Sequence, residues 1–165
     1  MKTPRPCVLD TCVASDVQAA GLWAAVSRLD IVLVVPQVVA VTEFRTDDID
    51  AAKDAGILVE PLSDDEELLA AALVRTYRRP SPNDLAALAL AKARGTTLLT
   101  GDGPLREAAT AESVPIHGVL WLLDQLVELA IVSPSRGAAA LQSMLDDGSR
   151  LPPGECGRRL RSWRS

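Results

Sequence analysis

The chain has 165 residues, which is about the length of one globular domain. Its hydrophobic content of 48% excludes an intrinsically disordered protein. Its 17 basic and 22 acidic residues give a net charge of −5, which excludes a uniformly basic surface for non-specific nucleic-acid binding.

Short apolar runs alternate with helical patterns along the first two thirds of the chain. Strands are predicted over residues 7–9, 31–35, 57–59, 96–100 and 114–117. Helices are predicted between and after them, over residues 13–26, 37–44, 63–77, 81–95, 105–112, 119–132, 134–147 and 155–163. The strands are continuous apolar runs, which is typical of a parallel sheet covered on both faces. The sequence therefore predicts an α/β fold with three α/β/α layers and a central parallel sheet.

Local signals mark several helix ends. Ser63 and Glu66 form an S-x-x-E capping box, and Ser81 followed by Pro82 opens an Ala/Leu-rich helix. The polar run over residues 46–54 is interpreted as a solvated loop or helix face. After residue 118 the pattern is only helical, so we expect an α/β core over residues 1–118 and a helical C-terminal extension over 119–165, packed on the same domain.

Cysteine spacing and hydropathy bear on the location of the protein. Its three cysteines are an odd number without a C-x-x-C spacing, so neither a disulfide framework nor a zinc knuckle is expected. This favours the reducing cytoplasm. No apolar run reaches the ~18 residues of a membrane span, so we expect no membrane partner.

Four acidic residues are candidates for one site at an edge of the predicted sheet. Asp10 follows the first strand directly, and Asp102 follows a later one. Glu43 is the only charged residue over residues 31–44, and Asp84 opens the Ala/Leu-rich helix. Ligands of open parallel sheets bind beyond the carboxyl ends of the strands, so we expect these carboxylates to converge there.

Each of these acids also has a purely structural interpretation. Asp10 suits the N-cap of the next helix, and Asp102 lies in a Gly-Asp-Gly-Pro turn. Asp84 suits the second half of a capping box with Ser81. Glu43 is the hardest to explain structurally, because a partly buried carboxylate without a partner is costly.

Four neighbouring carboxylates need a compensating cation or raised pKa values. Two of them ~4 Å apart repel by roughly 4 kcal/mol at an effective dielectric constant of about 20. All-oxygen sites favour Mg²⁺ or Mn²⁺, and such ions activate water for phosphodiester hydrolysis. The set therefore predicts metal-dependent hydrolysis of phosphoryl groups.

The segments VLDTCV, VVPQVVAVTEF, SPNDLAALALAKARG and TTLLTGD occur in this order. Together they resemble the PIN domain, the ribonuclease fold of VapC-type toxins, over roughly residues 7–118. The resemblance implies catalytic, metal-binding roles for four acids and supporting roles for two hydroxyls, namely Asp10, Glu43, Asp84, Asp102, Thr11 and Thr100. It also implies a Mg²⁺ or Mn²⁺ cofactor, cleavage of single-stranded RNA by metal-activated water, a homodimer and, for a toxin, a cognate antitoxin protein.

The chain departs from the family pattern in two places. Gly103 stands where many relatives carry another acid, and the helical segment after residue 118 exceeds the usual small core. Two other interpretations therefore stay open. One is a catalytically degenerate PIN-fold binding protein. The other is a haloacid-dehalogenase-like phosphatase, although Cys12 stands where that mechanism needs a second aspartate.

Basic side chains are the candidates for substrate binding. Arg106 follows Asp102 by one helical turn, and Arg78 and Arg79 precede the Ser81 cap. The tail over residues 150–165 holds five arginines and one glutamate, and a solvated role is favoured for it. His117, the only histidine, is interpreted as structural, and the three tryptophans as packing residues.

Overall fold

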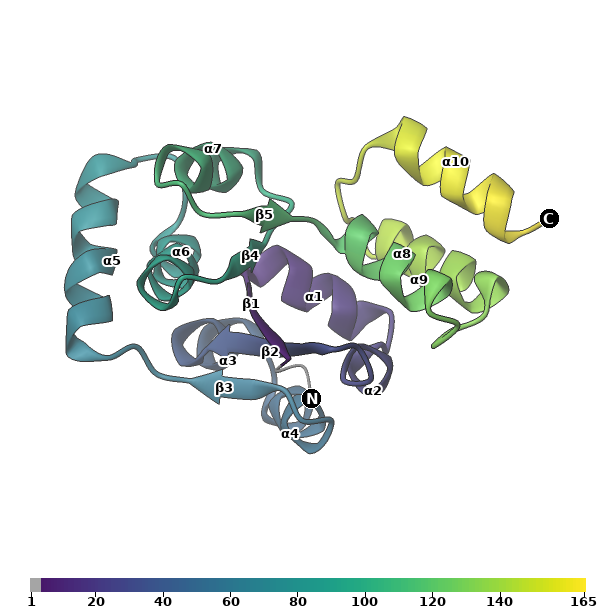
Figure 1. Cartoon of the computed structure of the whole chain (residues 1–165), viewed down its shortest axis with the longest axis horizontal. Coiled ribbons are helices and arrows are strands. Elements are labelled where there is room, and N and C mark those ends of the chain that lie inside the picture. The colour runs from purple at the N-terminus through teal and green to yellow at the C-terminus, as the bar shows by residue number, and fades with distance from the viewer. Residues whose placement is uncertain (1–3) are drawn as a thin grey trace.

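The computed structural model describes residues 4–165, which form a five-stranded parallel sheet between layers of helices (Figure 1). The strands are β1 (Arg5–Leu9), β2 (Ile31–Pro36), β3 (Leu58–Glu60), β4 (Thr97–Leu99) and β5 (Ile116–His117). They are ordered β3-β2-β1-β4-β5, and every pair is parallel. The predicted fold class is confirmed.

The centre of the sheet positions the candidate site. β1 pairs with β2, with Cys7 opposite Leu33, and with β4, with Leu9 opposite Leu99. The chain builds outward from β1 to β2 and β3 on one side, and through β4 to β5 on the other. The gap beyond the carboxyl ends of β1 and β4 is therefore the topological switch point, where ligands of open α/β sheets bind.

Two hydrophobic clusters occupy the two faces of the sheet. Successive strand residues point to opposite faces, so Leu9, Leu33 and Leu99 belong to one cluster, and Val8 and Leu98 to the other. The second cluster is covered by α5 (Asp64–Thr76), α6 (Pro82–Arg94) and α7 (Gly103–Ala111). The first is covered by α1 (Thr11–Ala19), α2 (Trp23–Val26), α3 (Gln37–Glu43), α4 (Thr46–Asp54) and α8 (Val119–Glu128), with α9 (Pro134–Asp146) outside them.

Glycine and capping residues set the helix ends. Gly95 ends α6 in the left-handed conformation (φ +62°), and both predicted capping boxes are present, at Ser63 and at Ser81. The single helix predicted over residues 13–26 is wrong. Gly21 adopts φ +63°, so α1 stops before it and α2 starts after it. The polar run over residues 46–54 is the helix α4 rather than a loop.

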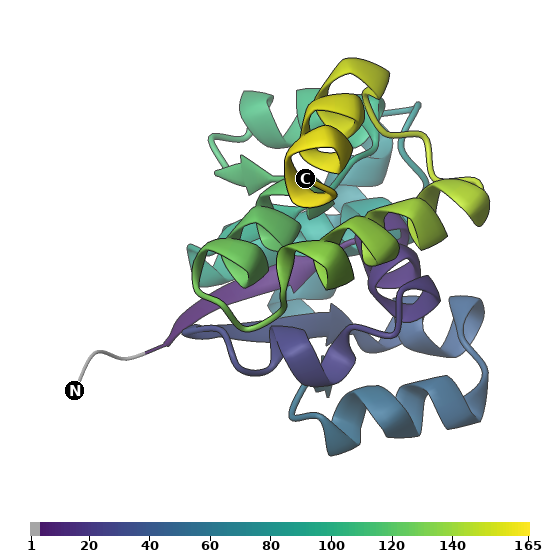
Figure 2. The ribbon, with the colours of Figure 1, turned by 90° about the vertical axis from the view of Figure 1, so that its right-hand side faces the viewer.

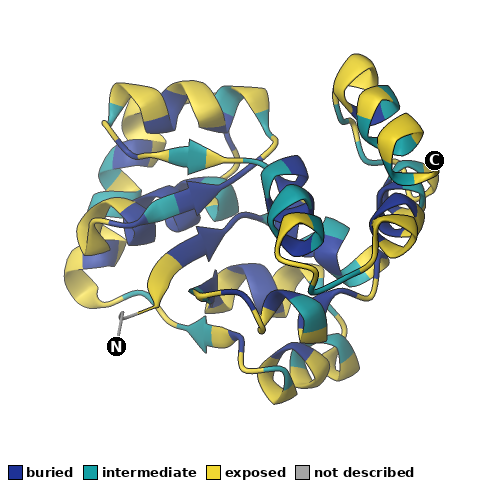
Figure 3. Ribbon diagram, turned by 45° about the vertical axis from the view of Figure 1, so that its right-hand side comes forward, coloured by how far each residue is buried: buried dark blue, intermediate teal, exposed yellow. Residues whose placement is uncertain are grey.

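The C-terminal helices α8 and α9 pack beside α1, and α10 packs on α9 (Figure 2). α8 and α9 contribute Leu123, Leu126 and Leu141 to the core cluster of β1, whereas α10 (Pro153–Trp163) buries only Cys156 and exposes most of its residues (Figure 3). Arg159 of α10 forms an ion pair with Asp124 of α8. No helix within residues 4–165 is long and apolar enough to cross a membrane. The division at residue 118 stays a prediction.

Candidate active site

Asp10 is the most deeply buried of the four predicted acids, with 0% of its surface exposed. It follows β1 and caps α1, because its Oδ1 accepts a hydrogen bond from the Val13 N–H at 2.8 Å. Its Oδ2 accepts from the hydroxyl of Thr100, which is also buried. Both carboxylate oxygens are therefore held in place.

Thr100 joins Asp10 to Asp102. The Thr100 hydroxyl donates to Asp10, while its oxygen accepts from the Asp102 backbone N–H at 3.1 Å. Asp102 in turn caps α7, since its Oδ2 accepts from the Leu105 N–H at 3.0 Å. The strand ends of β1 and β4 thus place these two aspartates around one hydroxyl.

Asp84 and Glu43 meet where α6 begins and α3 ends. Asp84 completes the capping box, with its N–H donating to Ser81 Oγ at 3.1 Å and its Oδ2 accepting from the Ser81 N–H at 3.3 Å. The Asn83 side-chain amide donates to Glu43 Oε1 at 3.4 Å. Glu43 is exposed, so the expectation that it is partly buried is wrong. It is the last residue of α3, where the helix no longer packs on the core.

Asp10 lies within electrostatic reach of Asp84 and Asp102, and Asp84 lies within reach of Asp102 and Glu43. Burial raises the pKa of Asp10 to about 7, and the carboxylates of Asp84 and Asp102 act in the same direction. Burial also raises the pKa of Asp84, helped by the charges of Asp102 and Glu43. Within residues 4–165 none of the four forms a salt bridge. The site therefore holds uncompensated negative charge.

The donor chemistry of the site fits a hard divalent cation. All the candidate donors are oxygens, and the caps occupy only one oxygen each of Asp84 and Asp102. The Thr11 hydroxyl, next to Asp10, is buried without a hydrogen-bond partner in the described chain. Across residues 4–165, however, no three acidic, histidine or cysteine side chains already form a metal-binding cluster. The four acids are therefore candidate metal ligands rather than a preformed metal-binding cluster.

A cleft of about 530 Å³, called here the acid cleft, lies beside Asp102, which is the one of the four predicted acids that lines it. Its lining residues are Thr11, Cys12, Ser15, Asp16, Gly101, Asp102, Gly103 and residues 147–151. Asp16 was not among the predicted site residues. Its Oδ2 accepts from the Ser149 hydroxyl at 3.1 Å, and burial, with the nearby Asp147, raises its pKa to about 6. The sequence offers a weak signal for Asp16, a lone acid among the apolar residues of α1.

The predicted substrate-binding arginines lie in different places. Arg106 lines a second cavity, next to the acid cleft. Arg78 and Arg79 are exposed before α6, and Arg79 pairs with Glu107 of α7 at 3.5 Å. Neither Arg78 nor Arg79 lines the acid cleft or the second cavity.

Comparison with known proteins decides the family. A family model described as PIN domain matches residues 6–165. The chain belongs to the PIN domain family. PIN domains commonly act as metal-dependent nucleases, and the predicted family is confirmed. The match extends through the helical segment after residue 118.

A solved structure has a similar fold. It is a PilT N-terminus domain protein from the hyperthermophilic archaeon Sulfolobus solfataricus P2, with a TM-score of 0.52 and 17% sequence identity. The similarity covers 74% of this chain and 94% of that chain. No curated protein matches the sequence. The VapC-like subtype of this PIN domain protein stays a prediction.

Proposed function

We propose that this PIN domain protein is a metal-dependent endoribonuclease that cleaves single-stranded RNA. One observation carries the proposal, namely that Asp10 and Asp102 share the Thr100 hydroxyl at the switch point of the sheet, with Asp84 and Asp102 close enough for their charges to raise the pKa of Asp10. Glu43 lies beside Asp84, and none of the four acids has a basic partner within residues 4–165. Single-stranded RNA is proposed as the substrate because the motifs resemble those of PIN-type ribonucleases.

The four acids would hold one or two Mg²⁺ or Mn²⁺ ions. When bound, such an ion lowers the pKa of a coordinated water and stabilises the negative charge that develops on the phosphodiester. The chain's own residues orient the ligands. The backbone N–H groups of Val13 and Leu105 fix the Asp10 and Asp102 carboxylates.

Thr100 has a supporting role in this proposal. Its hydroxyl is buried and donates to Asp10 Oδ2, so it fixes the position of that oxygen. The same hydroxyl accepts from the Asp102 backbone, which sets the start of α7. Thr11 would add a neutral oxygen beside Asp10.

Cleavage of labelled single-stranded RNA tests the proposal. We expect cleavage with Mg²⁺ or Mn²⁺, no cleavage with EDTA, and loss of cleavage in Asp102→Asn, whose circular dichroism stays native. Asp65→Asn, at an exposed aspartate in the first turn of α5, is the matched control and should cleave like the wild type. Cleavage that survives both EDTA and Asp102→Asn would contradict the metal mechanism.

The other two interpretations give different results in the same experiments. A degenerate PIN-fold binding protein would bind RNA without cleaving it under any metal condition. A haloacid-dehalogenase-like phosphatase would hydrolyse a small phosphate ester and lose that activity in Asp10→Asn. Cys12 stands two residues after Asp10, where that mechanism needs a second aspartate, which argues against the phosphatase.

The toxin role, a cognate antitoxin and a homodimer are proposals on the same resemblance. A cytoplasmic location is proposed from the three cysteines, whose number and spacing do not suit a disulfide framework. Sedimentation of the purified protein tests the dimer. Growth arrest on expression of the wild type, but not of Asp102→Asn, tests the toxin role.

A further inference from the structure

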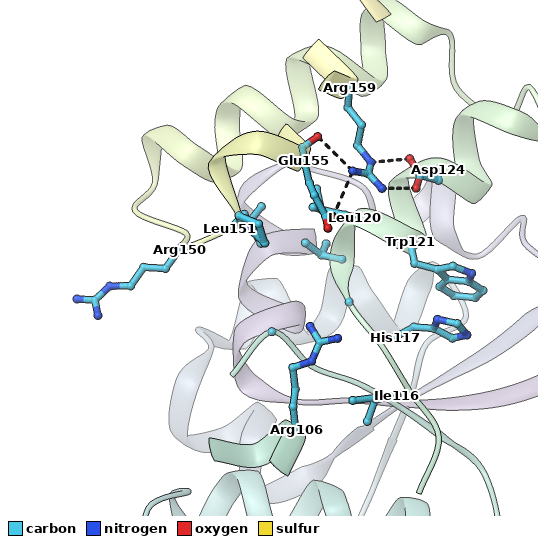
Figure 4. A pocket seen from close by; sticks show the side chains of 14 residues that line it. Arg106, Ile116, His117, Leu120, Trp121, Asp124, Arg150, Leu151, Glu155 and Arg159 are labelled. Atoms are coloured by element: carbon cyan, nitrogen blue, oxygen red, sulfur yellow. Dashed lines mark hydrogen bonds and ion pairs between the residues drawn. The ribbon is translucent and has the colours of Figure 1, made fainter. Parts of the chain in front are cut away.

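A second cavity of about 640 Å³, called here the arginine cavity, lies between the end of β5, the start of α8 and α10 (Figure 4). It and the acid cleft share three lining residues, Gly101, Arg150 and Leu151. The arginine cavity therefore begins where the acid cleft ends. A chain-like ligand that lies in the acid cleft beside Asp102 can extend into it.

Charge changes sign along this path. The acid cleft is lined by three aspartates and one arginine, whereas the arginine cavity is lined by three arginines and two acids. One of the three, Arg159, is already neutralised, since its guanidinium bonds both oxygens of Asp124 at 2.7 and 2.6 Å and pairs with Glu155 at 3.7 Å.

The other two arginines of the cavity are available to a ligand. Arg106 and Arg150 are exposed, and their side chains form no hydrogen bond or ion pair with any residue in the described range 4–165. Figure 4 shows Arg106 directed into the cavity and Arg150 extending outward from its mouth. Guanidinium groups suit the oxygens of phosphate.

A flat aromatic surface completes the cavity. The rings of His117 and Trp121 are stacked, with centroids 4.2 Å apart and planes within 9° of each other (Figure 4). Trp121 packs against the core and holds this pair in place, while His117 is exposed at the end of β5. Nucleic-acid bases stack on such rings without sequence preference.

We propose that the arginine cavity binds the part of the RNA strand that flanks the cleaved phosphodiester. Arg106 and Arg150 bind backbone phosphates, and one base stacks on His117. The proposal rests on the proposed nuclease function for the identity of the ligand. Free guanidinium groups alone would also suit an acidic peptide, but the flat aromatic pair beside them favours a nucleotide.

Binding of a short labelled oligouridylate in EDTA tests the two arginines without cleavage. Each of Arg106→Ala and Arg150→Ala should weaken binding roughly tenfold. Each should also reduce the slope of log K against log salt by about 0.7, the amount expected for one lost phosphate contact with a single strand. Arg75→Ala, at an exposed arginine on α5 at the other side of the molecule (Figure 1), is the matched control and should change neither quantity.

His117 variants test the base contact separately. His117→Ala should weaken binding about fivefold or more while leaving the salt slope unchanged, because stacking involves no counterion release. His117→Phe keeps a flat ring and should bind like the wild type. An abasic oligomer should bind the wild type and His117→Ala equally well. Circular dichroism and thermal melting of each variant identify a loss that comes from unfolding.

The outcomes separate this inference from the proposed function. If the wild type cleaves RNA but the double variant Arg106→Ala/Arg150→Ala binds as tightly as the wild type, the inference is overturned and the nuclease stands. If binding depends on the two arginines and His117 but no metal produces cleavage, the inference stands and the nuclease falls. Binding of polyglutamate through the arginines, with no binding of RNA, would overturn the inference.

Discussion

Replacement of Asp10 by asparagine is expected to stabilise the protein at neutral pH. The Asp10 carboxyl is fully buried, and its pKa is about 7 in the folded protein against an ordinary value of 3.8. Between these two values the unfolded chain has lost its proton and the folded chain keeps it. Unfolding therefore releases a proton, so the wild type loses stability as the pH rises through this window and levels off above about pH 7.

The size of the effect follows from the same two values. Each pH unit between 3.8 and about 7 lowers the free energy of unfolding of the wild type by about 1.4 kcal/mol, which adds up to at most about 4 kcal/mol. Asparagine can still accept from the Val13 N–H through its oxygen, but its amide nitrogen cannot accept from the Thr100 hydroxyl, a loss of about 1 kcal/mol. We expect Asp10→Asn to gain about 1–3 kcal/mol over the wild type at about pH 8 and to lose up to about 1 kcal/mol at about pH 4, where the missing hydrogen bond is the main difference.

Urea unfolding in EDTA, followed by circular dichroism at a series of pH values, measures this difference. Titrations common to both proteins largely cancel when the free energy of unfolding of the variant is compared with that of the wild type. Asp65→Asn, at an exposed site, should give a difference that does not change with pH. A flat profile for Asp10→Asn, or a loss of stability that grows toward alkaline pH, would refute the reasoning.

Three further predictions concern the metal, the hydroxyl and the packing of the C-terminal helices. Binding of Mn²⁺ should displace about one proton at about pH 6, because Asp10 is still largely protonated there, and none at about pH 8. Calorimetry in buffers of different ionisation enthalpy measures the number of protons released. Equal proton release at both pH values would contradict the prediction. Thr100→Val removes a hydrogen bond that lowers the pKa of Asp10, so the acid limb of the pH–cleavage profile should move to higher pH; an unmoved limb would exclude this role for the hydroxyl. Gly137→Ala should lower the free energy of unfolding in urea by about 1–3 kcal/mol, because a Cβ at this position would lie 2.6 Å from Val127 Cγ2. A variant as stable as the wild type would show that α8 and α9 can separate without cost.

Elements marked by short-range chemistry could be predicted from the sequence. The start of α6 is specified by Ser81 and Pro82 and its end by Gly95, all of which act on neighbouring backbone. The break at Gly21 was missed because Val17 and Val26 both stay buried against the same core, so the apolar period continues through it. A lone glycine is tolerated in helices, and tertiary packing decides between a break and a continuous helix.

The candidate site was predictable to the extent that topology determines it. Asp10 and Asp102 follow adjacent parallel strands, and such strand ends must meet. The exposure of Glu43 depends on which element covers the end of α3, and a single sequence does not specify that. His117 belongs to β5 and Trp121 to α8, so their stacking depends on how the two elements meet. Neither the two-residue period of a strand nor the 3.6-residue period of a helix predicts it.

The dual use of the aspartates has a consequence for how activity can be lost. Asp10 and Asp102 are the N-caps of α1 and α7, a position where asparagine and serine cap about as well as aspartate. One substitution at either position can therefore remove a proposed metal ligand and leave the helix start intact. For the proposed nuclease, an inactive form that still folds and binds RNA is thus a single substitution away.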